Sequence, residues 1–246
     1  TGMVQVHVRG NDPVHRIARQ TQGFQRPQQA RHGVGGAGVD EGGAAVVNDQ
    51  VGGVEAVAVE AGVDGVDAVA EGFDGEILVL CGDVPLVLPE TLKRLAETHR
   101  ASNAACTILT TELDEPTGYG RILRDHIGNI SGIVEHKDAT AAQRAVREIN
   151  TGIMLVSARR LRAWLPTLRS DNSQGEYYLT DLVTLVAAEA AVGMVQCPES
   201  ETAGVNDRVQ LAAIEQAFQH RYRQQHLLGG ATLVAPETVY FSADTV

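Results

Sequence analysis

The chain has 246 residues, of which 43% are hydrophobic, and a formal net charge of −11 at pH 7. This length allows one large domain or two small ones. The acidic balance argues against a nucleic-acid-binding protein, and no apolar run reaches the roughly 18 residues of a membrane span. The N-terminus shows no secretory signal, and the three cysteines lie far apart without CxxC spacing. We therefore expect a cytoplasmic protein without a zinc site or a disulfide framework.

The first part of the chain, residues 1–75, has an abnormal composition. It contains no Leu, Lys, Ser or Tyr, whereas residues 76–246 contain 20 Leu. All but three residues of 33–75 are Gly, Ala, Val, Asp or Glu, five amino acids whose codons all begin with G. Because selection for a fold has no reason to choose that set, our preferred hypothesis is that residues 1–75 are wholly or partly a wrong-frame or opposite-strand reading of a GC-rich gene. The alternative is a genuine Gly/Val/Ala-rich segment that is poorly ordered.

One short motif in this segment, GVGGAG at residues 33–38, formally matches the G-x-G-x-x-G fingerprint of dinucleotide-binding proteins. That fingerprint requires a strand before it and a helix after it. The preceding RPQQARH (26–32) has no strand pattern, and the residues that follow are Gly-rich. A chance match is therefore expected, and a dinucleotide-binding protein is an alternative that rests on this motif alone.

Residues 76–246 have the pattern of an ordinary α/β domain. In chain order, the apolar periodicity predicts a strand at 77–81, a helix at 89–100, strands at 106–113, 121–123 and 130–136, a mostly helical stretch at 139–149, a strand at 151–158, helices at 159–168 and 176–190, a strand at 193–197 and a long helix at 206–228. This alternation predicts a mostly parallel mixed sheet with helices on both faces.

The first strand of this domain ends on Gly82 and Asp83, shortly before Pro85. Ligands of open α/β sheets gather at the carboxyl ends of the strands, and glycine lets a ligand approach the backbone closely. A lone carboxylate facing a phosphate there suits Mg²⁺, which takes few protein ligands. An Asp that begins a turn before a proline explains the same string equally well, so the local sequence leaves both interpretations open.

Further motifs place polar groups at the ends of expected elements. They are EPTGYGRI (115–122) with two glycines around Tyr119, IVEHKDA (133–139) with Glu135, EINTGI (148–153) with Asn150, and GVNDR (204–208) with Asn206. Taken singly, each has a structural explanation: a tight loop, an exposed charged edge, a turn residue and a helix N-cap, a position that Asn favours.

Taken together, the motifs resemble one family. GDVPL, DEPTGYGRI, IVEHKDAT, EINTGI, QGEYYLTD and GVNDRVQL occur in the order and spacing typical of the uridyltransferase domain of the bacterial bifunctional N-acetylglucosamine-1-phosphate uridyltransferase/glucosamine-1-phosphate acetyltransferase. The resemblance covers about residues 76–240. It implies that residues 76–246 form a nucleotidyltransferase domain with a Rossmann-like nucleotide-diphospho-sugar transferase fold.

The resemblance also implies roles for single residues. In the family, the Asp of GDVPL and the first Asn of the GVN motif hold the catalytic Mg²⁺; here they are Asp83 and Asn206. The last Gly of GYG, here Gly120, lies against the substrate. The Glu of VEHKDA and the Asn of INTG, here Glu135 and Asn150, hydrogen-bond the N-acetylglucosamine part. The positions that line the nucleotide are Cys81, where the family often has Tyr, and Gly82.

The implied reaction is nucleotidyl transfer. The phosphate of N-acetylglucosamine 1-phosphate attacks the α-phosphorus of UTP, pyrophosphate leaves, and UDP-N-acetylglucosamine is formed for cell-wall peptidoglycan and lipopolysaccharide synthesis. Mg²⁺ is the implied cofactor, and no nucleic acid or membrane partner is expected.

Departures from the family concentrate in residues 1–75. The phosphate-cradling loop of the type LAAGxGTRM, the Lys of a following PK motif and the uracil-reading Q-x-x-x-G-T-x-H-A signature are all missing there. The chain ends at Val246, where the family's β-helix would begin, so we expect no acetyltransferase domain and a monomer. Two interpretations stay open: a family member whose N-terminal third is mis-read or replaced, and a catalytically dead remnant that at most binds sugar phosphate.

Overall fold

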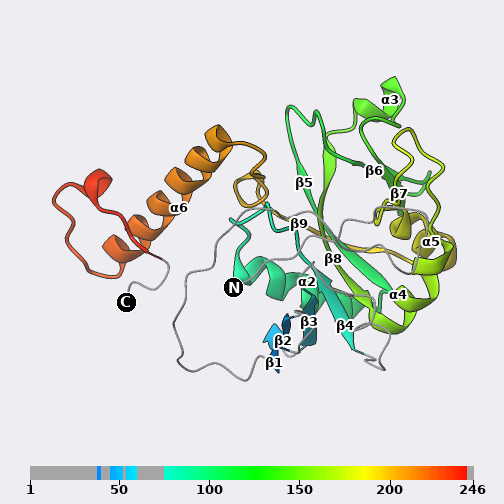
Figure 1. Cartoon of the computed structure of the whole chain (residues 1–246), viewed down its shortest axis with the longest axis horizontal. Coiled ribbons are helices and arrows are strands. Elements are labelled where there is room, and N and C mark those ends of the chain that lie inside the picture. Colours follow the sequence, from blue (N-terminus) through cyan, green and yellow to red (C-terminus); the bar gives the residue numbers. More distant parts are fainter. Residues whose placement is uncertain (1–37, 40–44, 52–53, 60–74, 243–246) are drawn as a thin grey trace.

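The computed structural model describes residues 38–39, 45–51, 54–59 and 75–242, with side chains described for 75–242 (Figure 1). Apart from Gly38, the GVGGAG motif lies outside the described residues, and so does most of the abnormal segment 1–75. Among the helices of the described part, none is long and apolar enough to cross a membrane.

One sheet runs through the molecule in the order β1-β2-β3-β4-β8-β5-β9, and β6 pairs with β8 and β7. The strands are β1 Gly38–Val39, β2 Ala45–Val51, β3 Val54–Val59, β4 Glu76–Val79, β5 Cys106–Glu112, β6 Arg121–Arg124, β7 Ile130–Val134, β8 Glu148–Ser157 and β9 Gly193–Gln196. The described strands of the abnormal segment therefore continue the sheet of the following domain.

Strand β8 sets the directions in this sheet. It lies between β4 and β5 and runs antiparallel to both, whereas β3 is parallel to β4 and β9 is parallel to β5. Consequently β3, β4, β5 and β9 all point the same way, although many neighbouring pairs are antiparallel. The sheet is mixed, as the sequence predicts, but it is not mostly parallel, because six of its eight described strand pairs are antiparallel. The carboxyl ends of β4, β5 and β9 lie toward one edge.

Helices cover both faces of the sheet, as expected. Successive strand residues point to opposite faces, and in β4 Ile77 and Val79 belong to one buried cluster while Leu78 belongs to another. The first cluster includes residues of α4 (Ala158–Trp164), the 3₁₀ turn Leu165–Thr167 and α5 (Asp181–Glu189); the second includes residues of α2 (Pro89–Ser102). The core therefore consists of two apolar layers with the sheet between them.

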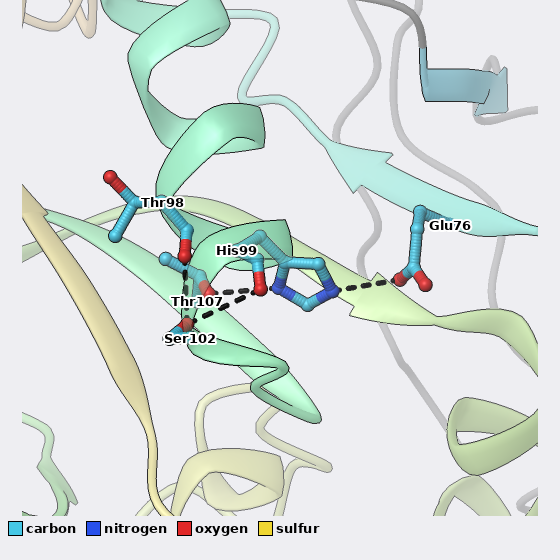
Figure 2. Close-up of polar contacts among 5 residues, drawn as sticks. All are labelled: Glu76, Thr98, His99, Ser102 and Thr107. Carbon is cyan, nitrogen blue, oxygen red and sulfur yellow. Dashed lines mark hydrogen bonds and ion pairs between the residues drawn. The ribbon is translucent and has the colours of Figure 1, made fainter.

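Helix α2 is also attached to the sheet by a buried histidine (Figure 2). His99 is 3% exposed; its Nδ1 lies 2.8 Å from the Thr107 hydroxyl on β5, and its Nε2 lies 2.9 Å from a carboxylate oxygen of Glu76 on β4. Both ring nitrogens are thus paired, as buried polar groups require. One side chain thereby connects the helix with two strands that do not pair with each other.

Two helices are much shorter than the sequence predicts, whereas α4 and α6 (Arg208–Leu228) differ from their predicted bounds by a few residues. The stretch expected to be mostly helical at 139–149 forms only α3 (Ala141–Arg144), which begins at a capping box of Thr140 and Gln143. Glu148 and Ile149 instead pair with β5 as the start of β8, because pairing with a distant strand outweighs local helix propensity. The helix expected at 176–190 begins only at Asp181 as α5, which leaves residues 176–180 as a loop.

The long helix α6 (Arg208–Leu228) projects from the sheet and is followed by a tail with a 3₁₀ turn at Pro236–Thr238 (Figure 1). Arg221 donates a 2.8 Å hydrogen bond to the Leu86 carbonyl and so ties the helix to the loop after β4. The Gln219 carboxamide bonds both backbone groups of Phe241 at 2.7 and 2.8 Å. The tail is therefore held against α6. A further 3₁₀ turn, Glu199–Glu201, precedes the helix.

Candidate active site

A cavity of about 690 Å³ opens where β4 ends. All but one of the residues that the sequence motifs single out line it: Cys81, Asp83, Gly120, Glu135, Asn150 and Asn206. The exception, Gly82, is an exposed residue between two of them. Segments that are far apart in sequence therefore meet at one site, and a volume of this size is typical of small-molecule sites.

Asp83 and Asn206 are brought together by a backbone contact. The Val205 N–H donates a 2.8 Å hydrogen bond to the Asp83 carbonyl. A Cβ on Gly204 would lie 3.7 Å from that carbonyl oxygen and 4.0 Å from Asn206 Nδ2. The cap of α6 is Asp207, whose carboxylate accepts from the Gln210 N–H. The Asn206 side chain therefore does not cap α6, which leaves it available to the cavity.

The oxygen ligands that Asp83 and Asn206 offer fit Mg²⁺. One carboxylate and one carboxamide oxygen are hard ligands, and Mg²⁺ commonly takes one or two protein ligands and completes its shell with substrate oxygens and water. Within the described residues there is no group of three or more His, Cys, Asp or Glu that could hold a metal ion. An ion bound by Asp83 and Asn206 would accordingly depend on oxygens of a bound phosphate.

The floor of the cavity is built around an irregularity in β8. Its register with β5 shifts between Ile108 and Thr110, and Gly152 has a φ of +81°. A Cβ on Gly152 would lie 2.4 Å from Cys81 Sγ, so this position requires glycine for both its backbone conformation and its space. Burial, with a smaller effect of the Asp83 charge, raises the pKa of the Cys81 thiol to about 12. Cys81 therefore acts as a neutral wall of the cavity.

Glu135 lines the same cavity, and its side chain is held in place. The Thr180 hydroxyl donates a 2.8 Å hydrogen bond to one of its carboxylate oxygens. A Cβ on Gly120 would lie 3.2 and 3.3 Å from the two carboxylate oxygens, so a larger residue would push the carboxylate away. The Gly120 carbonyl in turn accepts from the Asn150 N–H at 2.9 Å. These contacts fix the three residues that the resemblance assigns to the sugar relative to one another.

A buried arginine holds the backbone next to Gly120. Arg121 is 1% exposed, and its guanidinium donates to the backbone carbonyls of Tyr119 and Val146 and lies 3.4 Å from His136 Nδ1. Burial, with a further effect of Arg144, lowers its pKa. Because a trans peptide directs its C=O and N–H to opposite sides, holding the Tyr119 carbonyl also fixes the direction of the Gly120 N–H. Sequence reasoning missed Arg121, since an Arg at a strand start is usually exposed.

The loop 176–180 also lines the cavity and was assigned to a helix from the sequence. The phenol of Tyr178 has its pKa raised to about 12 by burial and by the charges of Asp138, Glu135 and Glu176. The pKa of Asp181 is raised by burial and by the charges of Glu135 and Asp138. The signal that could have placed this loop was the motif QGEYYLTD, whose polar residues precede the apolar periodicity of α5.

Comparisons with known proteins show which family the chain resembles. The sequence matches the family described as nucleotidyl transferase over residues 41–210. It is 47% identical over 176 residues to the bifunctional protein GlmU of Trichlorobacter lovleyi, covering 71% of this chain and 38% of that protein. It is 50% identical over 169 residues to the bifunctional protein GlmU of an Azoarcus species, covering 68% and 37%. The chain thus spans less than two-fifths of the length of these relatives.

Similarity to solved structures is weaker. A CMP:2-keto-3-deoxy-manno-octonic acid synthetase complexed with CTP has a TM-score of 0.49 at 14% identity, covering 63% of this chain and 66% of that one. An apo UDP-glucose pyrophosphorylase has a TM-score of 0.46 at 14% identity, covering 65% and 57%.

The family profile extends over most of the chain and includes every residue of the cavity that the motifs singled out. The relatives confirm the resemblance inferred from those motifs, at identities of 42–50%. The chain belongs to the nucleotidyl transferase family.

Proposed function

We propose that residues 76–246 carry the metal and sugar-phosphate part of an enzyme site that forms UDP-N-acetylglucosamine and pyrophosphate from UTP and N-acetylglucosamine 1-phosphate. The observation that carries the proposal is that the separate sequence motifs meet in one cavity. The relatives named bifunctional protein GlmU support the choice of reaction.

The chemistry requires positioning more than covalent participation. A phosphate oxygen of the sugar phosphate bonds to the α-phosphorus of UTP as the bond to the pyrophosphate oxygen breaks, so no enzyme intermediate is needed. Asp83 and Asn206 would hold Mg²⁺, which when bound supplies charge neutralisation for the phosphates. The contribution of the chain is to hold both substrates in one geometry, which accounts for much of the acceleration in such reactions.

On the sugar side, one acceptor is already held in place. Glu135, bonded by Thr180, accepts hydrogen bonds from sugar hydroxyls or an amide N–H, and the Asn150 carboxamide lines the same cavity. Groups whose orientation is fixed before binding lose less entropy when the ligand arrives.

A second candidate function is favoured by the charges of the cavity. Its described lining contains carboxylates from Asp83, Glu135 and Glu176 but no Lys, Arg or His. The triphosphate of UTP therefore finds no cation among the described lining residues. This favours a protein that binds the sugar phosphate and turns over little or not at all by itself.

Pyrophosphate release from UTP, N-acetylglucosamine 1-phosphate and Mg²⁺ tests both candidates. We expect little or no turnover by the chain as it stands, turnover after a family-type N-terminus is restored ahead of Glu76, and loss again in the restored protein with Asp83→Ala. Asp114→Asn is the matched control, because Asp114 is an exposed carboxylate outside the cavity lining. Robust turnover by the unmodified chain would contradict our interpretation of residues 1–75. Failure of the restored protein would overturn the proposed reaction.

A further inference from the structure

Two buried polar atoms, one of them on a residue that lines the cavity, have no hydrogen-bond partner among the described protein groups. They are the hydroxyl of Thr110 on β5 and the carboxamide oxygen Oδ1 of Asn150 on β8. Thr110 is completely buried and Asn150 is 8% exposed. Buried polar atoms nearly always form a hydrogen bond with protein or with ordered water. We therefore looked for one partner that could bond both atoms.

The two residues are direct neighbours across the sheet. Thr110 lies opposite Asn150 in the antiparallel register of β5 and β8. The Thr110 carbonyl accepts from the Cys197 N–H, at the end of β9, and the Asn150 N–H donates to the Gly120 carbonyl, next to β6. Their backbone groups thus point away from each other. Such a pair is of the non-hydrogen-bonded kind, in which the Cα atoms lie about 4.5 Å apart and the side chains are closest.

The carboxamide has a defined orientation. Asn150 lines the cavity, and its Oδ1 is the buried, unpaired atom. The NH₂ end is therefore the end that a ligand can reach. A half-turn of the carboxamide would present the oxygen instead, so some interaction has to distinguish the two orientations. A water that bonds the Thr110 hydroxyl and donates to Oδ1 does so, because the NH₂ group cannot accept that hydrogen bond.

We propose that Thr110 is a positioning residue that, through one buried water, holds the Asn150 carboxamide with Oδ1 inward and its NH₂ group toward the cavity. The site then offers a hydrogen-bond donor and prefers a ligand with an acceptor at that point, such as an acetamido carbonyl, over one with an ammonium group. The choice of ligand rests on the proposed function, whereas the water bridge does not.

Two variants test the bridge without any ligand. Thr110→Val removes the hydroxyl at nearly constant volume, and Thr110→Ser keeps it. We expect the urea midpoint to fall for Thr110→Val, since the water loses one partner and Oδ1 loses its donor, and to stay close to that of the unmodified chain for Thr110→Ser. An unchanged or raised midpoint for Thr110→Val would show that an unpaired hydroxyl had been removed, and would overturn the bridge.

A crystal structure provides the direct observation. We expect electron density for one water within hydrogen-bond distance of Thr110 Oγ1 and Asn150 Oδ1, and its loss in Thr110→Val. A dry contact between the two side chains would overturn the bridge.

Ligand selectivity tests the positioning role. Calorimetric titrations with N-acetylglucosamine 1-phosphate and glucosamine 1-phosphate give a ratio of affinities, which we expect Thr110→Val to lower about tenfold and Thr110→Ser to preserve. The matched control is Thr111→Val, on the opposite face of β5, where the hydroxyl bonds the Cys197 carbonyl at 2.9 Å. It should lower the urea midpoint and leave the ratio unchanged.

The outcomes separate this inference from the proposed function. An unchanged ratio in Thr110→Val overturns the positioning role. If the unmodified chain binds neither sugar phosphate, the proposed function fails, while the urea midpoints and the crystal structure still decide the bridge.

Discussion

Gly152 and Cys81 show how one small residue shapes the cavity floor. The φ of +81° at Gly152 is a conformation that residues with a Cβ rarely adopt, and the space where a Cβ would lie is occupied by Cys81 Sγ. The family position that often holds Tyr is therefore filled here by a thiol that contacts the backbone of β8, with Cys81 Sγ 3.5 Å from the Thr151 carbonyl.

We expect Gly152→Ala to lower the free energy of unfolding by about 1–2 kcal/mol for the left-handed backbone alone, and further because of the contact with Sγ. Adding Cys81→Ala should remove the loss of stability that the contact with Sγ causes. The loss that the left-handed backbone causes should remain. Urea unfolding of the two single variants and the double variant measures this coupling. Strictly additive losses would show that the two residues do not compete for space.

Asp181 provides a prediction about pH. Its pKa in the folded protein is raised above the ordinary value of 3.8 by burial and by the charges of Glu135 and Asp138, so ionising it costs folding free energy although it lies at a helix N-terminus. This loss sets in as pH rises above 3.8 through the folded pKa. Asp181→Asn should therefore have a higher Tm than the unmodified chain at pH 7, with the difference vanishing below pH 3.8.

Thermal unfolding across this pH range checks the expectation. Asp171→Asn, in the exposed loop before α5, is the control and should change the Tm little. A difference at Asp181 that persists below pH 3.8 would show that its charge is not the cause.

From the sequence we identified the residues to which the family resemblance assigns a role. We missed residues whose role depends on contacts in the folded chain. Asp83 and Asn206 were identified together through the resemblance, although the local sequence allowed a turn and a helix cap; the structure places the cap at Asp207 instead. Thr180 and Arg121 lie within the motifs QGEYYLTD and EPTGYGRI, but no role was assigned to them, because a threonine before a helix and an arginine at a strand start are common. Their contacts depend on loops that approach only in the folded chain.

At the scale of elements, α2 depends on one buried polar side chain as well as on its apolar face. Leu95 and Ala96 pack into the second core cluster, while His99 bonds Thr107 and Glu76 (Figure 2). The imidazole thereby fixes the position of α2 along β4 and β5. Apolar contacts of Leu side chains alone would specify this position less strictly.

His99→Leu should lower the free energy of unfolding by about 1–3 kcal/mol, because it leaves the completely buried Thr107 hydroxyl without this partner. His126→Leu, in the exposed turn between β6 and β7, is the matched control and should change stability little. Urea unfolding compares the two. An equal effect of both substitutions would show that the buried hydrogen bonds of His99 contribute nothing.

The expected elements were found in their predicted order, and errors occurred at their boundaries. The stretch at 139–149 contains good helix formers, but its last residues pair with β5. A pattern in the local sequence contains no information about a partner strand that is distant in sequence. The loop 176–180 was assigned to α5 because Tyr177 and Leu179 continue its apolar pattern. Both side chains pack against the first core cluster without being helical.

At the scale of the whole molecule, the family match begins at a different residue from the one at which the composition changes. The nucleotidyl transferase match begins at residue 41, and strands β2 and β3 extend the sheet. Leu, Lys, Ser and Tyr nevertheless first appear after residue 75. The proposal that residues 1–75 are mis-read, wholly or partly, and the expectation that they are poorly ordered remain untested, since most of them lie outside the described residues.

The coding DNA around codon 76 decides the proposal when it is read in all six frames. We expect another frame to encode the G-x-G-T-R-M and G-T-x-H-A motifs at family spacing ahead of Glu76, because a cavity without a described cation needs them to bind a triphosphate. Their absence from every frame would favour a genuine Gly-rich segment.

The central position of β8 also has a consequence for synthesis of the chain. β4 and β5 are synthesised before β8 and do not pair with each other. Each of them pairs with β8, whose last residue is Ser157. At about 5–20 residues per second, several seconds pass on the ribosome between the completion of β5 and that of β8. During this interval two apolar strands have unpaired edges, which are sites of aggregation. The nascent chain should therefore depend on chaperones until β8 has left the exit tunnel.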